Sequence, residues 1–311
     1  MTQAFVFPGQ GSQTVGMGQV LAQTYPEAKA VFDEVDAALG QNLSDIMWNG
    51  QPETLTLTEN AQPALMAVSM AVMRVLEARG VKLADAAAYV AGHSLGEYAA
   101  LTAAGALQLD DASRLLKLRG QAMQRAVPVG VGAMAALLGL EFSVVAEIAQ
   151  EAASKTQVCA AANDNANGQV VISGHAEAVA RAIELAKERG AKRAMNLPVS
   201  APFHCSLMQP AADEMAAALA ETNIQAPSVP LIANVTAEAT QDPELIRNLL
   251  IEQVTGSVRW RESMIWAADQ GVTDLVEIGT GKVLTGMARR IDDRLAARAL
   301  NAPEDIQDFT N

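Results

Sequence analysis

The chain has 311 residues, of which half are apolar and 18% are charged, a composition typical of globular rather than disordered proteins. A net charge of −13 argues against general nucleic-acid binding, because no phosphate-neutralising basic surface can dominate at this balance. No apolar run approaches the roughly 18 residues that span a bilayer, and no basic leader precedes the first strand. We therefore expect a cytoplasmic protein, in which the only cysteines, Cys159 and Cys205, are buried free thiols.

The first third of the chain is predicted to begin with a strand and then become helical. In chain order we expect a strand at 4–7 that enters a glycine-rich turn at 8–12, helices up to residue 80 with breaks near 49–50 and at Pro63, a buried strand at 86–91, and a helix at 97–104. A strand, a tight turn and a helix thus follow one another around residue 94.

Between residues 128 and 200 the pattern changes to that of a separate unit. We expect a strand at 132–138, a helix at 142–153, a strand at 158–162, a turn at 163–168, a strand at 169–173, a helix at 176–189 and a strand at 193–199. This βαββαβ order is the ferredoxin-like arrangement. Outside it, strands such as 231–235 and 274–278 alternate with helices, which predicts a mostly parallel sheet covered on both faces. The predicted core comprises residues 1–127 and 201–311, and the inserted subdomain residues 128–200.

The pentapeptide Gly92-His93-Ser94-Leu95-Gly96 matches the G-x-S-x-G nucleophile elbow. A serine on such a turn has a strained backbone, and flanking β-carbons would clash with the turn. The helix that follows would direct backbone N–H groups at a developing negative charge. The alternative is an ordinary turn of small residues, but the strand-turn-helix context favours Ser94 as a nucleophile.

A serine hydroxyl needs a base, and the chain contains only three histidines. His93 adjoins the serine, but adjacent side chains on such a turn point in different directions. His175 follows a hairpin strand and opens a helix, which is typical of a helix-start residue. His204 lies directly after the inserted unit, where its alternative role is that of a partly buried histidine with satisfied hydrogen bonds. Elimination of the other two makes His204 the candidate general base.

The predicted helix over 111–126 carries an apolar stripe that contains one charged residue. Arg119 lies four residues from both Leu115 and Met123, inside the stripe, whereas the other basic residues of the helix lie off it. A buried guanidinium must have an anion. That anion is either an internal carboxylate, which is the commoner case, or a substrate carboxylate held bidentately. Beside an ester-forming serine, the second alternative would select acyl groups with a free carboxylate, such as malonyl.

Six motifs in a fixed order span nearly the whole chain. They are FVFPGQGSQ at 5–13, GHSLGEYAAL at 92–101, LRGQAM at 118–123, AANDNANGQVVISG at 161–174, APFHC at 201–205 and VEIGTGKVLTG at 276–286. Together they resemble the malonyl-CoA:acyl carrier protein transacylases and the related acyltransferase domains of polyketide synthases. The resemblance implies an α/β-hydrolase-like core with a ferredoxin-like subdomain. It also implies malonyl transfer in fatty acid biosynthesis, from malonyl-CoA to the phosphopantetheine thiol of an acyl carrier protein.

The resemblance further implies roles for single residues. Ser94 is similar to the acylated nucleophile, His204 to its base and Arg119 to the clamp on the malonyl carboxylate. The other implied roles are backbone N–H donors of the oxyanion hole at Gln10 and Leu95, a main-chain carbonyl that orients the histidine at Gln253, a cleft-lining residue at Asn163, and selection of malonyl over methylmalonyl at Phe203. The chain departs from the family at residues 254–257, Val-Thr-Gly-Ser, where many relatives end in Asn-Pro, and at Thr280, where Pro is common.

The partners follow from the resemblance and from charge. We expect no bound cofactor or metal, because coenzyme A enters as a substrate thioester and phosphopantetheine is carried by the partner. An acidic carrier protein needs a local basic surface on this monomer. The candidates are the runs Lys187, Arg189, Lys192, Arg193 and Lys282, Arg289, Arg290, whose alternative is a solvated helix face.

Three other functions stay open at this point: a serine esterase or thioesterase, an acyltransferase component of a polyketide synthase, and a non-catalytic docking subunit. Hydrolases with this elbow normally add an acid that orients the histidine. The glycosylation pattern Asn234-Val235-Thr236 has no meaning in a cytosolic protein.

Overall fold

The larger of two sheets forms the centre of the core. It is described here from a computed structural model that covers residues 2–199 and 201–310. Six strands lie in the order β10-β9-β1-β2-β7-β8. Their bounds are β1 Gln3–Phe7, β2 Tyr89–Gly92, β7 Leu231–Ile232, β8 Ala239–Thr240, β9 Asp274–Ile278 and β10 Ala296–Leu300. All neighbours are parallel except β7 and β8, which confirms the mostly parallel sheet.

Strand β1 shows why helices cover both faces of this sheet. Phe5 and Phe7 enter one apolar cluster, whereas Ala4 and Val6 enter another, because successive side chains of a strand point to opposite faces. The first cluster is covered by α1 Gln19–Thr24, α2 Pro26–Leu39, α3 Leu43–Asn49, α4 Pro52–Thr56, α5 Thr58–Ala78, α6 Leu83–Ala86, α7 Gly96–Ala103, α8 Leu109–Ala126, the 3₁₀ turn Ser206–Met208, α11 Gln209–Glu221, α12 Pro243–Gln253 and α15 Pro303–Thr310. The second is covered by α13 Trp260–Asp269 and α14 Val283–Ile291.

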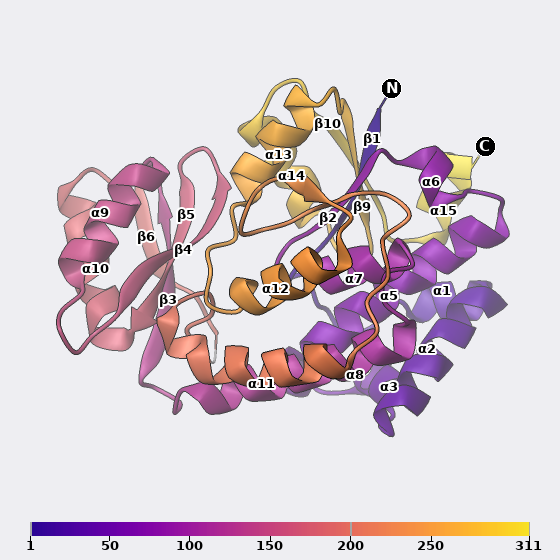
Figure 1. The fold of residues 1–311 in the computed structure, drawn as a ribbon, viewed down its shortest axis with the longest axis horizontal. Coiled ribbons are helices and arrows are strands. Elements are labelled where there is room, and N and C mark those ends of the chain that lie inside the picture. The colour runs from indigo at the N-terminus through magenta and orange to yellow at the C-terminus, as the bar shows by residue number, and fades with distance from the viewer. Residues whose placement is uncertain (1, 200, 311) are drawn as a thin grey trace.

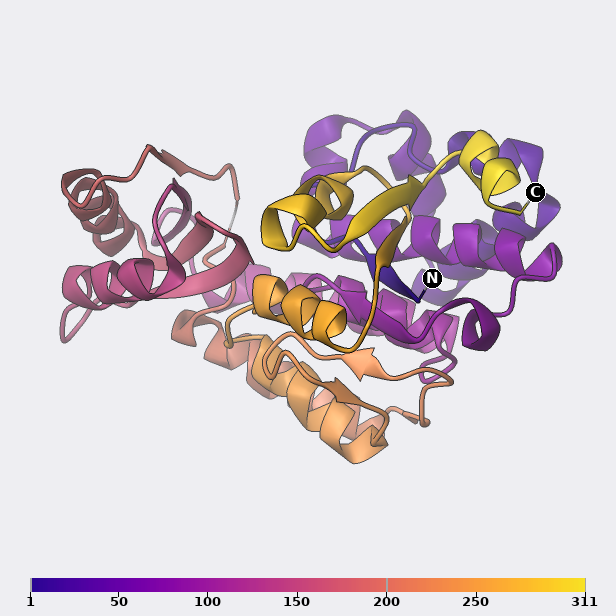
Figure 2. The same ribbon diagram turned by 90° about the horizontal axis from the view of Figure 1, so that it is seen from above.

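The inserted unit has its own sheet and its own apolar core. Its elements are β3 Gly132–Leu138, α9 Phe142–Ala152, β4 Cys159–Ala166, β5 Gln169–His175, α10 Ala176–Glu188 and β6 Arg193–Asn196. The strands are antiparallel in the order β4-β5-β3-β6, which confirms the βαββαβ prediction. Figures 1 and 2 show this unit at one end of the molecule, beside the larger sheet. The predicted boundary at residue 200 lies outside the described residues.

The predicted turn over residues 163–168 is wrong, and the error bears on the site. Strand β4 continues to Ala166, so the turn is only Asn167-Gly168. The pairing with β5 shifts register twice within the polar residues of β4, and Asn163 forms a β-bridge with Val258 of the core. Polar residues therefore stay in a strand because the core supplies hydrogen-bond partners that a sequence does not reveal.

Other predicted bounds need smaller corrections. The expected break at Pro63 is wrong, since that residue lies inside α5, whose burial against the core outweighs one lost hydrogen bond. The strands expected at 86–91, 193–199 and 231–235 are shorter, at 89–92, 193–196 and 231–232. Both cysteines are free and buried, as predicted. Among the described residues, no helix is long and apolar enough to cross a membrane.

Candidate active site

The nucleophile elbow joins β2 to α7. Ser94 lies between them with a φ of 54°, a left-handed conformation that is costly for a residue with a β-carbon. A β-carbon on Gly92 would lie 1.9 Å from the carbonyl carbon of Gly96, and one on Gly96 would lie 2.3 Å from the oxygen of Phe7. Glycine is therefore required on both sides of the serine, as the sequence predicted.

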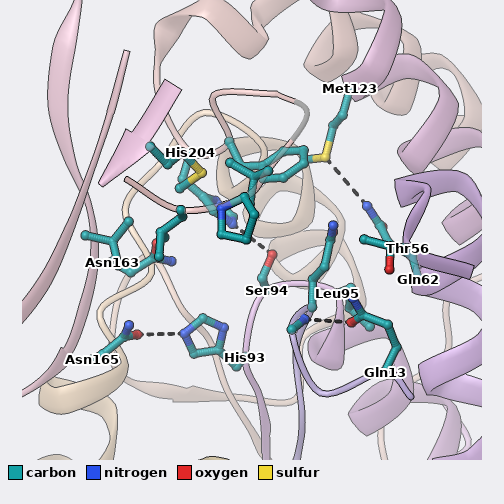
Figure 3. Close-up of a pocket in the computed structure, with 18 of the residues that line it drawn as sticks. Gln13, Thr56, Gln62, His93, Ser94, Leu95, Met123, Asn163, Asn165 and His204 are labelled. Carbon is teal, nitrogen blue, oxygen red and sulfur yellow. Dashed lines mark hydrogen bonds between the residues drawn. The ribbon is translucent and has the colours of Figure 1, made fainter. Parts of the chain in front are cut away.

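His204 contacts the serine directly. Its Nε2 lies 2.8 Å from Ser94 Oγ, as the dashed line in Figure 3 shows. Its Nδ1 lies 2.9 Å from the main-chain oxygen of Gln253 and 3.2 Å from that of Gly256. Two carbonyl acceptors require the proton on Nδ1, so Nε2 is free to accept the proton of the serine. Among the described residues, the ring has no carboxylate partner.

The environment keeps this histidine neutral. His204 is 4% exposed, and it also has a left-handed backbone, with a φ of 60°. Burial, followed by the positive charge of Arg119, lowers the pKa of His204 from 6.5 to about 3. At neutral pH the ring is thus in the form that can act as a base.

Arg119 is buried beside the serine, with only 1% of its surface exposed. Its Nη1 donates to Gln62 Oε1 at 2.9 Å, and its Nη2 donates to Gln253 Oε1 at 2.8 Å and to Ser94 Oγ at 3.2 Å. Within residues 2–199 and 201–310, its Nε has no hydrogen-bond partner. Every ion pair found among the described residues involves other cations, so the internal salt bridge considered from the sequence does not form. A buried cation with neutral partners is suited to bind an anionic ligand.

A cavity of about 480 Å³ opens above these side chains, between the core and the inserted unit. Figure 3 shows the serine, both neighbouring histidines and the strand β4 asparagines around it. The predicted site residues that line it are Gln10, Ser94, Leu95, Arg119, Asn163, Phe203 and His204. The side chain of Gln253 does not line the cavity but lies directly behind Arg119 and Ser94.

The backbone N–H groups of Gln10 and Leu95 differ from that of the serine. Ser94 N–H donates to Asn234 Oδ1 at 2.8 Å. Within the described part of the chain, neither Gln10 N–H nor Leu95 N–H donates to another protein group. Both residues line the cavity, so two main-chain donors are available to a ligand beside Ser94.

No role was predicted from the sequence for several residues of the site. His93 Nε2 lies 2.8 Å from Asn165 Oδ1 at the edge of the cavity, and Gln62 holds Arg119. Asn165 lines the cavity with Asn163 because β4 continues past the predicted turn, which the sequence does not indicate. No sequence signal indicates Gln62 or Asn234, whose partners are distant in the chain.

Comparisons with known proteins agree with this geometry. The acyl transferase domain family matches residues 4–297. The chain is 50% identical over 304 residues to the malonyl CoA-acyl carrier protein transacylase of Escherichia coli (strain K12), covering 97% of each chain. The corresponding protein of Bacillus subtilis (strain 168) is 45% identical, with 98% of this chain and 95% of that protein covered.

Solved structures give the same result. The acyl-carrier-protein S-malonyltransferase of Bartonella henselae has a TM-score of 0.97 and 56% identity, covering 99% of this chain and 98% of that one. A malonyl-transacylase solved in complex with a type II polyketide synthase acyl-carrier protein has a TM-score of 0.95 and 43% identity, with 99% and 98% covered. This chain therefore belongs to the acyl transferase domain family and, within it, to the malonyl CoA-acyl carrier protein transacylases.

Proposed function

We propose that the chain transfers a malonyl group from malonyl-CoA to the phosphopantetheine thiol of an acyl carrier protein in fatty acid synthesis, through an ester on Ser94. The observation that carries this proposal is Arg119, a buried guanidinium 3.2 Å from the nucleophile with no internal carboxylate partner among the described residues. Such a group binds preferentially an acyl chain that ends in a carboxylate, because two N–H groups of the guanidinium can donate to its two oxygens. Its similarity to malonyl transacylases supports the proposal.

In the first half-reaction, His204 Nε2 takes the proton of Ser94 Oγ as that oxygen attacks the thioester carbonyl. The N–H groups of Gln10 and Leu95 stabilise the oxyanion of the tetrahedral intermediate. The carbon–sulfur bond then breaks, and the imidazolium returns the proton to the coenzyme A thiolate. The products are free coenzyme A and a malonyl ester on Ser94.

In the second half-reaction, the phosphopantetheine thiol enters the same cavity. His204 takes its proton, the thiolate attacks the ester carbonyl, and the same two N–H groups hold the oxyanion. The carbon–oxygen bond breaks, and Ser94 Oγ recovers the proton from the imidazolium. Throughout, Arg119 holds the malonyl carboxylate, and we propose that Phe203 and Asn163 limit the shape of the acyl and pantetheine binding space.

The arrangement around His204 favours this transfer over simple hydrolysis. Serine hydrolases with this elbow orient the histidine with an Asp or Glu. Here two main-chain carbonyls face Nδ1 instead. Although the chain departs from the family after Gln253, His204 is still held by main-chain groups, since Gly256 supplies the second carbonyl.

Intact-mass spectrometry after incubation with malonyl-CoA tests the proposal. The wild-type protein should gain one malonyl group and lose it when carrier protein is added, whereas Ser94→Ala should gain none. Acetyl-CoA provides the control for acyl selection. A wild-type protein that stays unmodified, or that releases free malonate faster than it loads carrier protein, would contradict the proposed transfer.

We further propose that an acidic carrier protein docks on the α14 patch, defined as Lys282, Arg289 and Arg290. All three are exposed, and among the described residues none of them forms an ion pair. Helix α14 packs against β4, the strand that supplies Asn163 to the cavity. In the other basic run, Lys187 and Arg189 pair with glutamates, so only Lys192 and Arg193 are left without an ion pair among the described residues. The patch therefore combines free positive charge with proximity to the cavity.

Charge reversal tests this docking surface. Arg289→Glu/Arg290→Glu should raise the KM for carrier protein about tenfold and leave the KM for malonyl-CoA unchanged, because only the protein partner contacts the patch. The matched control, Lys187→Glu/Arg189→Glu, changes the net charge equally and should have little effect. Equal increases for both double variants would show that overall charge, not this patch, governs the encounter.

We also propose a domain division, an oligomeric state and a compartment for the protein. The core is proposed to comprise residues 1–127 and 201–311, with the subdomain at 128–200, and the protein is proposed to act as a monomer without a resident cofactor. Two buried free thiols fit a reducing compartment such as the cytoplasm.

A further inference from the structure

The ladder between β2 and β7 ends just before the nucleophile elbow. Val90 pairs with Leu231 and Ala91 with Ile232, and in the described part of the chain these two strands form no further backbone pair. Continuing the same register places Asn234 opposite His93. At this point two polar main-chain groups still face β7: the C=O of Gly92, which is buried, and the N–H of Ser94, which is half-buried.

The side chain of Asn234 fills that place. Its Oδ1 accepts the N–H of Ser94 at 2.8 Å, and its Nδ2 donates to the carbonyl of Gly92 at 2.7 Å. In a parallel ladder, a residue accepts from the N–H that follows its partner and donates to the C=O that precedes it. One side-chain amide thus reproduces the hydrogen bonds that a backbone residue opposite His93 would make.

The main chain of Asn234 is directed elsewhere. Its N–H donates to the carboxylate of Glu97, and its C=O accepts from the N–H of Arg259 at 3.0 Å. Asn234 is completely buried. The strand has therefore turned away from β2, and only the reach of the side chain continues the pairing.

We propose that Asn234 is a positioning residue for the nucleophile, which fixes Ser94 in its left-handed conformation by acting as a substitute strand. This inference rests on the proposed function. The amide holds both ends of the Gly92–Ser94 segment, so the serine cannot relax toward an extended or helical backbone without losing one buried and one partly buried hydrogen bond. The strain at a φ of 54° is maintained by these contacts.

The same contact determines which N–H groups face the ligand. Because Ser94 N–H is bound to Asn234, it points away from the cavity, and the two oxyanion donors are left as Gln10 and Leu95. On the other side, Gln253 Nε2 donates to the carbonyl of Ser94 at 2.9 Å. Two amide side chains from different elements therefore hold the two main-chain polar groups of the nucleophile.

Rapid-quench measurement of Ser94 malonylation tests the proposal. Asn234→Asp keeps the shape and the acceptor but, when ionised, loses the donor to Gly92, and Asn234→Ser adds no buried charge but is too short to bridge both groups. Either variant should slow acylation by about a hundredfold, because a misplaced oxygen loses its near-attack geometry. The Kd for malonyl-CoA, measured with the same changes in a Ser94→Ala background, should change by less than about twofold, because Arg119 still binds the carboxylate.

Ser69→Ala is the matched control. It removes one buried side-chain hydrogen bond, to the carbonyl of Ile278 at the end of β9, in the same sheet but away from the elbow. It should leave the acylation rate near that of the wild type.

The outcomes distinguish a failure of the proposed function from a failure of the positioning role of Asn234. A wild-type protein that is not malonylated would overturn the proposed function. A labelled wild type with an Asn234 variant that acylates at the same rate, or one whose loss lies wholly in Kd, would overturn the positioning role. If Asn234→Asp does not fold, the same criteria apply to Asn234→Ser. Slow acylation with unchanged Kd supports the role.

Discussion

Arg119→Ala is expected to slow malonylation of Ser94 by about 10²- to 10³-fold. Two charge-assisted hydrogen bonds to a carboxylate contribute roughly 3–4 kcal/mol, and each 1.36 kcal/mol corresponds to a tenfold change in rate. An acetyl group has no carboxylate that Arg119 could bind, so the rate of acetylation should change little. The preference for malonyl over acetyl should therefore be largely lost. Single-turnover rates with malonyl-CoA and acetyl-CoA, compared within each variant, measure this change in selectivity.

Two further variants of helix α8 make the test specific. Arg119→Lys keeps the charge but not the planar fork, so we expect it to recover only part of the malonyl rate. Arg114→Ala removes an exposed arginine that pairs with Asp110 and Asp111 on the same helix, and it should be neutral. If Arg119→Ala left both acyl rates unchanged, the clamp would be excluded.

His204→Ala is expected to lower the acylation rate by about 10²- to 10⁴-fold, the usual contribution of a general base. The reason is the 2.8 Å contact between Nε2 and Ser94 Oγ, which no other base among the described residues duplicates. Burst kinetics with malonyl-CoA measure the loss. His175→Ala is the control, because that ring accepts the N–H of Val158 and does not line the cavity.

The same histidine sets the pH dependence. Its pKa is lowered to about 3, so protonation removes the base only when the pH falls through that low value. Log kcat/KM should therefore be flat between pH 5 and 7, whereas a histidine with the ordinary pKa of about 6.5 would already be mostly protonated at pH 5. An inflection between pH 6 and 7 that disappears in His204→Ala would show that the ring is less desolvated than the structure indicates.

The parts of the site that the sequence predicts are those held by local rules. The elbow glycines follow from the clash of β-carbons, and the position of Arg119 follows from helical periodicity, which is a property of one helix. The chain order of strands and helices likewise predicts the sheet and the inserted unit. These features need only short-range information.

The features that the sequence does not predict depend on contacts between distant segments. Residues 163–166 have turn-like composition, yet they form a strand because Val258 lies beside them. In the sequence, Asn234 is only the first residue of a glycosylation pattern. Its contact with the elbow arises because β7 lies next to β2 in the fold. The choice between an internal and an external anion for Arg119 also required the positions of every nearby carboxylate.

The neutral surroundings of Arg119 have a consequence for the order of events in the reaction cycle. In the unloaded protein this buried cation forms no ion pair among the described residues, and Glu97, whose pKa burial raises to about 8, is linked to it only through the amide of Gln253. In the proposed mechanism, the malonyl ester on Ser94 brings a carboxylate to this cation from within the covalent intermediate. In the proposed cycle, loading would therefore give Arg119 the ion pair that it lacks in the empty protein, which would stabilise the intermediate until a carrier protein binds.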